Sequence, residues 1–225
     1  MQFEEVLREL ESLADPKAVE GMARFGINAK NTCGVSIPNL RVMAKIIGRN
    51  HVLAQRLWSS GVHEARILAS MIDAPEMVIE EQMENWVKDF DSWDVCDQVC
   101  SNLFDKTKLA HLKAVEWSRR KEEFVKRAGF VLMAALSVHD TGAEDAAFFK
   151  FLPIIKRESA DDRNFVKKAV NWALRQIGKR NVALNRAAVT TAEEIRKMDS
   201  KSARWIGLDA LRELTSEAVQ KRLRG

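Results

Sequence analysis

The chain has 225 residues, 46% of them hydrophobic, which is enough for a continuous core over one large domain or a run of stacked repeats. No stretch approaches the roughly 18 uncharged apolar residues of a membrane span, and the N-terminus, Met1 to Glu5, lacks the basic region and apolar run of a secretory signal. These observations exclude a membrane-spanning protein and argue against a secreted one.

The net charge of +4 is unevenly distributed along the chain. Residues 1–100 carry 10 Lys and Arg against 16 Asp and Glu, a balance of −6, whereas residues 101–225 carry 26 against 16, a balance of +10. This asymmetry indicates a polyanion-binding part after residue 100, with an ordinary solvated helix surface as the alternative.

The chain has three cysteines, and two of them, Cys96 and Cys100, are one helical turn apart. That spacing suits two thiols on a helix face better than a disulfide framework and favours the cytoplasm. Because the four histidines are scattered, we expect no metal site and no cofactor.

Helical periodicity dominates from the first residues onward. Phe3, Val6, Leu7, Leu10 and Leu13 follow the i, i+3, i+4, i+7 pattern, as do Ala65, Leu68, Ala69 and Ile72. No sustained alternation predicts a strand. The sequence therefore predicts an all-α chain.

Prolines and polar breaks divide this chain into helices. Pro16, Pro38 and Pro75 precede or open helical patterns, because a proline costs no hydrogen bond in the first turn. A Gly-containing loop is expected from about Gly26 to Pro38. Further breaks fall at residues 48–50, 59–61, 89–92, 105–106, 139–142, 159–162 and 179–181. We expect about a dozen to fourteen helices of roughly 10 to 17 residues.

Three segments share a pattern of a basic residue beside a small alanine and an apolar run: residues 62–69, 124–131 and 165–172. The last two start 41 residues apart, which is in the range of HEAT-type helical repeats. Such repeats stack into a superhelix with a concave surface. No linker interrupts the chain, so we expect a single domain over residues 1–225.

Residues 89–97 concentrate carboxylates around a tryptophan. Ser92 is expected to cap the following helix, and Asp94 in its first turn complements the helix dipole. Asp97 has no such structural explanation, and it lies one turn beyond Trp93 on the same helix face. The alternative is a solvent-facing aspartate beside a half-buried tryptophan.

Two further segments carry candidate binding residues. Lys126 and Arg127 begin a strongly apolar helix, and we expect them to extend to solvent; in the alternative, Arg127 lies in a groove and binds a phosphate or carboxylate. Lys168, Trp172 and Arg175 share one helix face, which suits a sugar–phosphate backbone beside a base. A core tryptophan on a helix with a basic outer face is equally compatible.

Taken together, these three helices resemble those of the AlkD family of DNA alkylation repair glycosylases. The resemblance rests on Ser-Trp-Asp-x-x-Asp at residues 92–97, Lys-Arg-Ala at 126–128 and Trp-Ala-Leu-Arg at 172–175. It extends to Gly-Val-Ser-Ile-Pro-Asn-Leu-Arg at 34–41 and covers nearly the whole chain. It implies a right-handed α-α superhelix of stacked HEAT-like helical pairs whose concave basic face holds duplex DNA.

The resemblance also implies roles for individual residues. Trp93 and Trp172 correspond to the aromatics that border the deoxyribose of the lesion, Asp97 to the carboxylate at the scission site and Arg127 to the arginine that holds the backbone there. Ser36 and Arg175 match positions that contact phosphates. As further DNA-binding candidates we take Arg41, Lys126, Lys168 and Lys179.

The implied activity is hydrolysis of the N-glycosidic bond of cationic purines, N3-alkyladenine and N7-alkylguanine, in duplex DNA. A cationic base is already a good leaving group, so a carboxylate that stabilises the oxocarbenium-like sugar suffices. No metal, no lyase step and no base-binding pocket are implied. The partner is double-stranded DNA with alkylated bases, and the expected state is a cytoplasmic, nucleoid-associated monomer. The alternatives are a catalytically inactive binder of duplex or branched DNA and a protein-binding solenoid.

Overall fold

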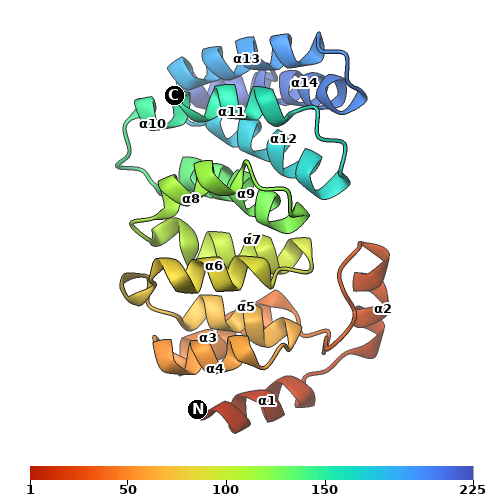
Figure 1. The fold of residues 1–225 in the computed structure, drawn as a ribbon, viewed down its shortest axis with the longest axis vertical. Coiled ribbons are helices and arrows are strands. Elements are labelled where there is room, and N and C mark those ends of the chain that lie inside the picture. Colours follow the sequence, from red (N-terminus) through yellow and green to blue (C-terminus); the bar gives the residue numbers. More distant parts are fainter. Residues whose placement is uncertain (225) are drawn as a thin grey trace. The chain divides into compact units, whose positions relative to one another are not determined.

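The computed structural model describes residues 1–224, and its regular elements are all helical (Figure 1). The fold divides into two compact units, Met1–Lys108 and Leu109–Gly225. Fifteen α-helices occur in the described residues, against a dozen to fourteen expected, so the prediction of an all-α chain is confirmed. None of the helices in residues 1–224 is both long and apolar enough to cross a bilayer.

The first unit contains seven α-helices and two short 3₁₀ helices. They are α1 (Phe3–Ser12), α2 (Pro16–Arg24), α3 (Ile37–Ile47), α4 (His51–Ser59), α5 (His63–Ile72), η1 (Pro75–Met77), α6 (Glu80–Lys88), α7 (Trp93–Asn102) and η2 (Phe104–Lys106). Helix α5 packs against α3, α4 and α7, so it is the central helix of this unit (Figure 1).

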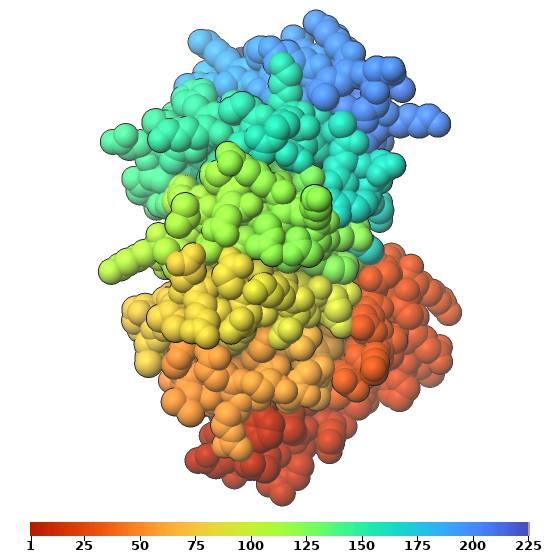
Figure 2. All heavy atoms as spheres, in the orientation of Figure 1, coloured from red at the N-terminus to blue at the C-terminus, as the bar shows by residue number. Residues whose placement is uncertain are grey.

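The second unit contains eight α-helices. They are α8 (Ala110–Trp117), α9 (Glu123–His139), α10 (Asp145–Phe149), α11 (Phe151–Glu158), α12 (Asn164–Gly178), α13 (Val182–Arg196), α14 (Lys201–Leu214) and α15 (Glu217–Arg224). Helix α9 packs against α8 and α12, and α14 packs against α12 and α13. In Figure 2 the surface of the second unit follows the chain in consecutive bands, whereas in the first unit the red-orange surface around α2 lies beside the orange and yellow bands.

The prolines begin helices where the sequence placed them. Pro16 is the first residue of α2, and the Asp15 carboxylate accepts hydrogen bonds from the N–H groups of Lys17 and Ala18 at 2.9 and 3.1 Å. Pro38 lies in the first turn of α3, and Pro75 opens η1. A ring without an N–H donor is tolerated there because first-turn donors have no partner within the helix.

Large aromatic side chains form the core of the first unit. Trp58 and Trp86 stack with their ring centroids 4.0 Å apart, and Phe90 and Phe104 pack at their edges. The Trp58 indole N–H donates to the Asp89 carboxylate at 2.9 Å, so the polar end of this buried ring has a partner.

The core of the second unit is organised around α9, which is buried from Val125 to Ser137. A side chain at Gly129 would place its Cβ 2.4 Å from the Ser118 backbone nitrogen, so a glycine lets α9 approach the end of α8. On the opposite side, the rings of Phe124 and Phe165 lie 5.5 Å apart. The two similar segments predicted 41 residues apart therefore lie on neighbouring helices, α9 and α12.

Candidate functional site

Trp93 and Asp97 lie on the first two turns of α7, and both are half-buried. Ser92 occupies the N-cap position as predicted, but its side chain forms no capping hydrogen bond. The Ser92 hydroxyl is buried, with no partner among the described atoms, so the expected cap interaction is wrong in this detail. Trp93 and Asp97 are one turn apart on α7, and both are half-buried.

The Trp93 indole is tied to the loop that follows α2. Its N–H donates to the Phe25 carbonyl at 3.0 Å. Nearby, the Asn28 side-chain amide donates to the Asp91 carboxylate at 2.7 Å. These two bonds connect the α2–α3 loop to the start of α7 and restrict the orientation of Trp93.

That loop is in turn held by Glu64, a carboxylate on α5 that is 1% exposed. It accepts hydrogen bonds from the backbone N–H groups of Cys33, Gly34 and Val35 at 2.9, 2.6 and 3.3 Å. Gly34 has a φ of +82°, and a Cβ there would lie 2.4 Å from the Asp15 carbonyl oxygen. The conformation of this segment therefore depends on both Glu64 and a glycine.

Directly after this segment, Ser36 caps α3. Its hydroxyl accepts from the Asn39 N–H at 3.5 Å, and the residue is exposed. Arg41, one turn into α3, is also exposed and has no ion pair among the described side chains. Both residues remain accessible for the phosphate contacts predicted from the sequence.

His63 adds a titratable group beneath the start of α7. It is 4% exposed, and its Nε2 lies 2.8 Å from an Asp94 carboxylate oxygen. Burial lowers the pKa of His63, but the hydrogen bond and charge of Asp94, with Glu64 and Asp91, outweigh burial, and the pKa is raised above 6.5. A protonated His63 therefore stabilises the carboxylate next to Trp93.

In the second unit, Lys126 and Arg127 are buried, contrary to the expectation that they extend to solvent. They are 9% and 5% exposed. Lys126 Nζ lies 2.6 Å from the Glu158 carboxylate and 2.9 Å from that of Asp161. Because two carboxylates already neutralise this ammonium, we no longer count Lys126 among the residues that bind DNA.

In this cluster the ionised form of Asp161 is strongly stabilised. Burial raises its pKa, but hydrogen bonds from Arg163 and Lys126 outweigh burial and lower it to about 2. The Arg163 guanidinium also donates to the Lys121 carbonyl at 2.6 Å. The cluster thus joins the ends of α8 and α11 to the start of α9.

Arg127 points toward the start of α12. Its Nη1 donates to the Phe165 carbonyl at 2.6 Å. Trp172 lies two turns further along α12 and is half-buried, so it is not a core tryptophan. The structure thus places Arg127 and Trp172 on neighbouring helices of one unit, and Trp93 and Asp97 on one helix of the other.

The remaining basic candidates on α12 differ in their surroundings. Lys168 is exposed, with no ion pair among residues 1–224. Arg175 and Lys179 instead share the Glu213 carboxylate of α14, and the Lys179 contact measures 2.6 Å. Burial raises the pKa of Glu213, but the hydrogen bond from Lys179 and the charges of Arg175 and Lys179 outweigh it and lower the pKa. Sequence reasoning missed this carboxylate.

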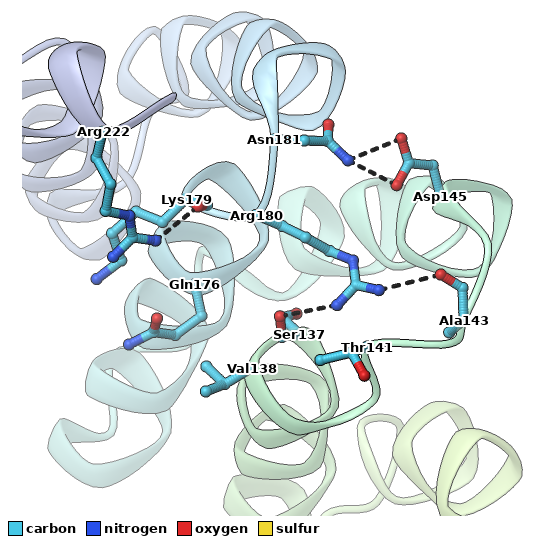
Figure 3. Close-up of a pocket in the computed structure, with 10 residues that line it drawn as sticks. All are labelled: Ser137, Val138, Thr141, Ala143, Asp145, Gln176, Lys179, Arg180, Asn181 and Arg222. Carbon is cyan, nitrogen blue, oxygen red and sulfur yellow. Dashed lines mark hydrogen bonds between the residues drawn. The ribbon is translucent and has the colours of Figure 1, made fainter. Parts of the chain in front are cut away.

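A cavity of about 600 Å³ in the second unit collects three basic residues, Lys179, Arg180 and Arg222 (Figure 3). Arg180 donates to the carbonyls of Ser137, in the last turn of α9, and of Asp140 and Ala143, which follow that helix. Arg222 donates to the Lys179 carbonyl at the end of α12. The two guanidinium groups therefore satisfy helix C-terminal carbonyls, which is a structural role.

Among the residues that the structure describes, no group of three or more His, Cys, Asp or Glu side chains is placed to hold a metal ion. In this part of the chain Cys33, Cys96 and Cys100 form no disulfide, and Cys96 and Cys100 lie one turn apart on α7.

The chain matches the model of a family described as DNA alkylation repair enzyme over residues 6–214. It belongs to this family. The match confirms the resemblance drawn from the residues around Trp93, Arg127 and Trp172.

One solved structure aligns with 99% of this chain and 96% of its own, at a TM-score of 0.81 and 22% identity. It is described as a new family of proteins related to the HEAT-like repeat DNA glycosylases, with affinity for branched DNA structures. At this identity the likeness shows the fold, so the prediction of HEAT-like helical pairs for this alkylation repair family member is confirmed. No curated protein gives a significant match.

Proposed function

We propose that this member of the DNA alkylation repair enzyme family is a monofunctional DNA glycosylase that releases cationic alkylated purines from duplex DNA. The observation that carries the proposal is the pair on α7. Asp97 lies one turn beyond Trp93, both side chains are half-exposed, and the indole is held by the Phe25 carbonyl. A carboxylate beside an electron-rich ring suits a site where positive charge develops.

In the proposed reaction the bond between C1′ and the purine nitrogen breaks, and its electron pair leaves with the already cationic base. The Asp97 carboxylate stabilises the positive charge that forms on the sugar, and it orients a water molecule. The water oxygen bonds to C1′, and the proton that it loses passes to the solvent. The product is an abasic site, and the phosphodiester backbone remains intact.

The other candidate residues are assigned to positioning the DNA. We propose that Trp172 borders a deoxyribose of the bound DNA, and that Arg127 holds the DNA backbone. Ser36, Arg41 and Lys168 are accessible for phosphates. Arg175 and Lys179 contact phosphates to the extent that DNA competes with Glu213 for them. The protein acts on alkylated double-stranded DNA as a single domain and a monomer, in the cytoplasm and at the nucleoid.

The test is release of N3-methyladenine and N7-methylguanine from duplex DNA treated with a methylating agent, measured by chromatography of the free bases. Asp97→Asn is expected to reduce release by about 100-fold or more, with DNA affinity close to that of the wild type. The matched control is Asp162→Asn, an exposed carboxylate in the loop before α12, which should keep wild-type activity. Full activity of Asp97→Asn would remove Asp97 from its role.

The second candidate is a catalytically inactive binder of duplex or branched DNA. It is favoured by the related solved structure, which is described as having affinity for branched DNA. The same experiment separates the two functions. If the wild type binds DNA but releases no alkylated base, the glycosylase proposal fails and the binder remains.

A further inference from the structure

Helix α14 exposes two large apolar side chains one turn apart. Trp205 is 41% exposed and Leu208 is 58% exposed. The opposite side of the helix is fully buried, through Ala203, Ile206 and Ala210. Exposing an indole and a leucine side by side costs free energy unless something covers them in function.

Basic groups surround this apolar pair. Lys167 Nζ of α12 lies over the Trp205 ring, 5.0 Å from its centroid. Lys201, Arg204 and Arg212 occupy the same exposed side of α14. Two carboxylates offset part of this charge, because Asp199 lies 3.3 Å from Arg204 and Asp209 contacts Arg212. The surface keeps a cationic excess.

The helix that carries Trp205 packs against α12, the helix that carries several of the proposed DNA contacts. Three contacts join the helices at a constant spacing of 38 residues: Lys167 to Trp205, Asn171 to Asp209 at 2.7 Å, and Arg175 to Glu213. The two helices therefore run side by side in register. Trp205 therefore lies beside the α12 row of Lys167, Asn171 and Arg175, and Arg175 is one of the proposed phosphate contacts.

We infer that Trp205, together with Leu208, is a stacking site for an unpaired nucleobase of a DNA strand whose phosphates bind Lys167, Lys201 and Arg204. An exposed aromatic ring bordered by cations fits a single strand, since each base presents a π-face and each nucleotide carries a negative charge. Bases within a continuous duplex are already stacked on each other. The site therefore selects ends, overhangs or junctions, where an unpaired base is available.

This inference rests on the proposed DNA-binding function and adds a second surface to it. The surface differs from the α7 site in chemistry, because it needs no carboxylate and changes no covalent bond. It also differs from the proposed Trp172 contact, in which the ring borders a deoxyribose rather than stacks on a base.

The experiment compares the affinity of the full chain for a blunt duplex with that for the same duplex carrying a short single-stranded overhang. Trp205→Ala is expected to lower the affinity for the overhang DNA by about 5- to 100-fold, and by much less for the blunt duplex. Trp205→Phe retains a ring and should keep most of the preference. Leu112→Ala removes an apolar side chain of α8 that is 57% exposed, and it is the control expected to change neither affinity.

A second measurement places 2-aminopurine in the overhang, because its fluorescence is quenched on stacking. The wild type should quench the signal on binding, and Trp205→Ala should not. Equal loss of affinity for both DNAs, or unchanged quenching in Trp205→Ala, would overturn the stacking site while leaving the glycosylase proposal intact. Conversely, a wild type that prefers the overhang through Trp205 but releases no base would support this site and overturn only the glycosylase.

Discussion

In residues 1–108 the buried charged groups are carboxylates and a histidine, whereas in residues 109–224 they are lysines and an arginine. The first set comprises His63, Glu64, Asp73 and Asp105, and the second Lys113, Lys126 and Arg127. The carboxylates Glu64 and Asp73 accept hydrogen bonds from backbone N–H groups and polar side chains. The cations instead contact carboxylates and carbonyl oxygens.

This difference changes how the charge of each unit is interpreted. The balance of +10 after residue 100 indicated a surface for a polyanion. Part of that charge is bonded to groups within the protein. Lys126 contacts Glu158, Arg180 donates to the Asp140 carbonyl, and Arg175 and Lys179 both contact Glu213. The number of basic side chains available to DNA is therefore smaller than the charge balance indicates. Five predictions test how each unit uses its charged residues.

The largest expected effect follows from removing the carboxylate that holds the α2–α3 loop. Glu64→Ala leaves three backbone N–H groups without an acceptor and should lower the free energy of unfolding by about 3–5 kcal/mol. Urea denaturation measures the change. Glu76→Ala, at an exposed carboxylate of η1, is the control and should lie within about 0.5 kcal/mol of the wild type. A similar small loss for Glu64→Ala would contradict the anchoring role.

The corresponding change in the second unit is Lys126→Met. It leaves Glu158 and Asp161 close together without their shared ammonium, although Arg157 and Arg163 still contact them. We expect a loss of about 2 kcal/mol in unfolding free energy. The salt dependence of DNA binding should not change. Lys150→Met, at an exposed lysine, is the control for stability. A reduced salt dependence in Lys126→Met would return this residue to the DNA-binding set.

Glu213→Gln should strengthen DNA binding. The amide no longer neutralises Arg175 and Lys179, so both cations become more available for phosphates, although Arg175 keeps Asp209 at 3.7 Å. If each forms one contact, the slope of log affinity against log salt steepens by about 1.8. Fluorescence titrations at several salt concentrations measure it. Glu217→Gln removes an exposed carboxylate of α15 and is the matched control. An unchanged slope would show that the two residues do not face DNA.

Lys168→Met tests a cation that has no ion pair among the described residues. One lost phosphate contact should lower the salt slope by about 0.9, with little change in unfolding free energy because the side chain is exposed. The same titrations measure the slope, and Lys150→Met again serves as the control. A slope equal to that of the wild type would exclude Lys168 from the interface.

The smallest effect concerns pH. Because the pKa of folded His63 is raised above 6.5, its interaction with Asp94 stabilises the protein fully below about pH 6.5 and is lost as pH rises through the folded value. The difference in unfolding free energy between wild type and His63→Gln should therefore shrink from pH 5.5 to 8.5. Urea denaturation across this range measures it, and a difference that grew with pH would contradict the assignment.

Much of the fold could be predicted from the sequence, because helix starts and apolar periodicity are local properties. Pro16 and Pro38 opened helices as expected, and the segments beginning at Phe124 and Phe165 lie on adjacent helices. The prediction of a capping hydrogen bond from Ser92 was wrong, because a favourable residue at an N-cap position need not form the bond.

The partners of the charged residues could not be predicted in the same way. Lys126 meets Asp161, 35 residues later, and Arg175 meets Glu213, 38 residues later. Such pairs depend on which residues of two neighbouring helices lie side by side. A local sequence pattern does not predict this alignment. Once one contact sets the offset, as Lys167 with Trp205 does at 38 residues, the next pairs along the two helices follow from it.

The spacing of these contacts has a consequence for how the chain folds. Glu64 accepts a hydrogen bond from Gly34, His63 is hydrogen-bonded to Asp94, and Arg175 donates to Glu213. In each pair the partners are 30 to 38 residues apart. Contacts of this range close only short loops and can form before the rest of the chain is ordered. We therefore expect rapid folding that begins at several places, and unfolding that starts at the terminal helices α1 and α15, which pack only weakly on their neighbours.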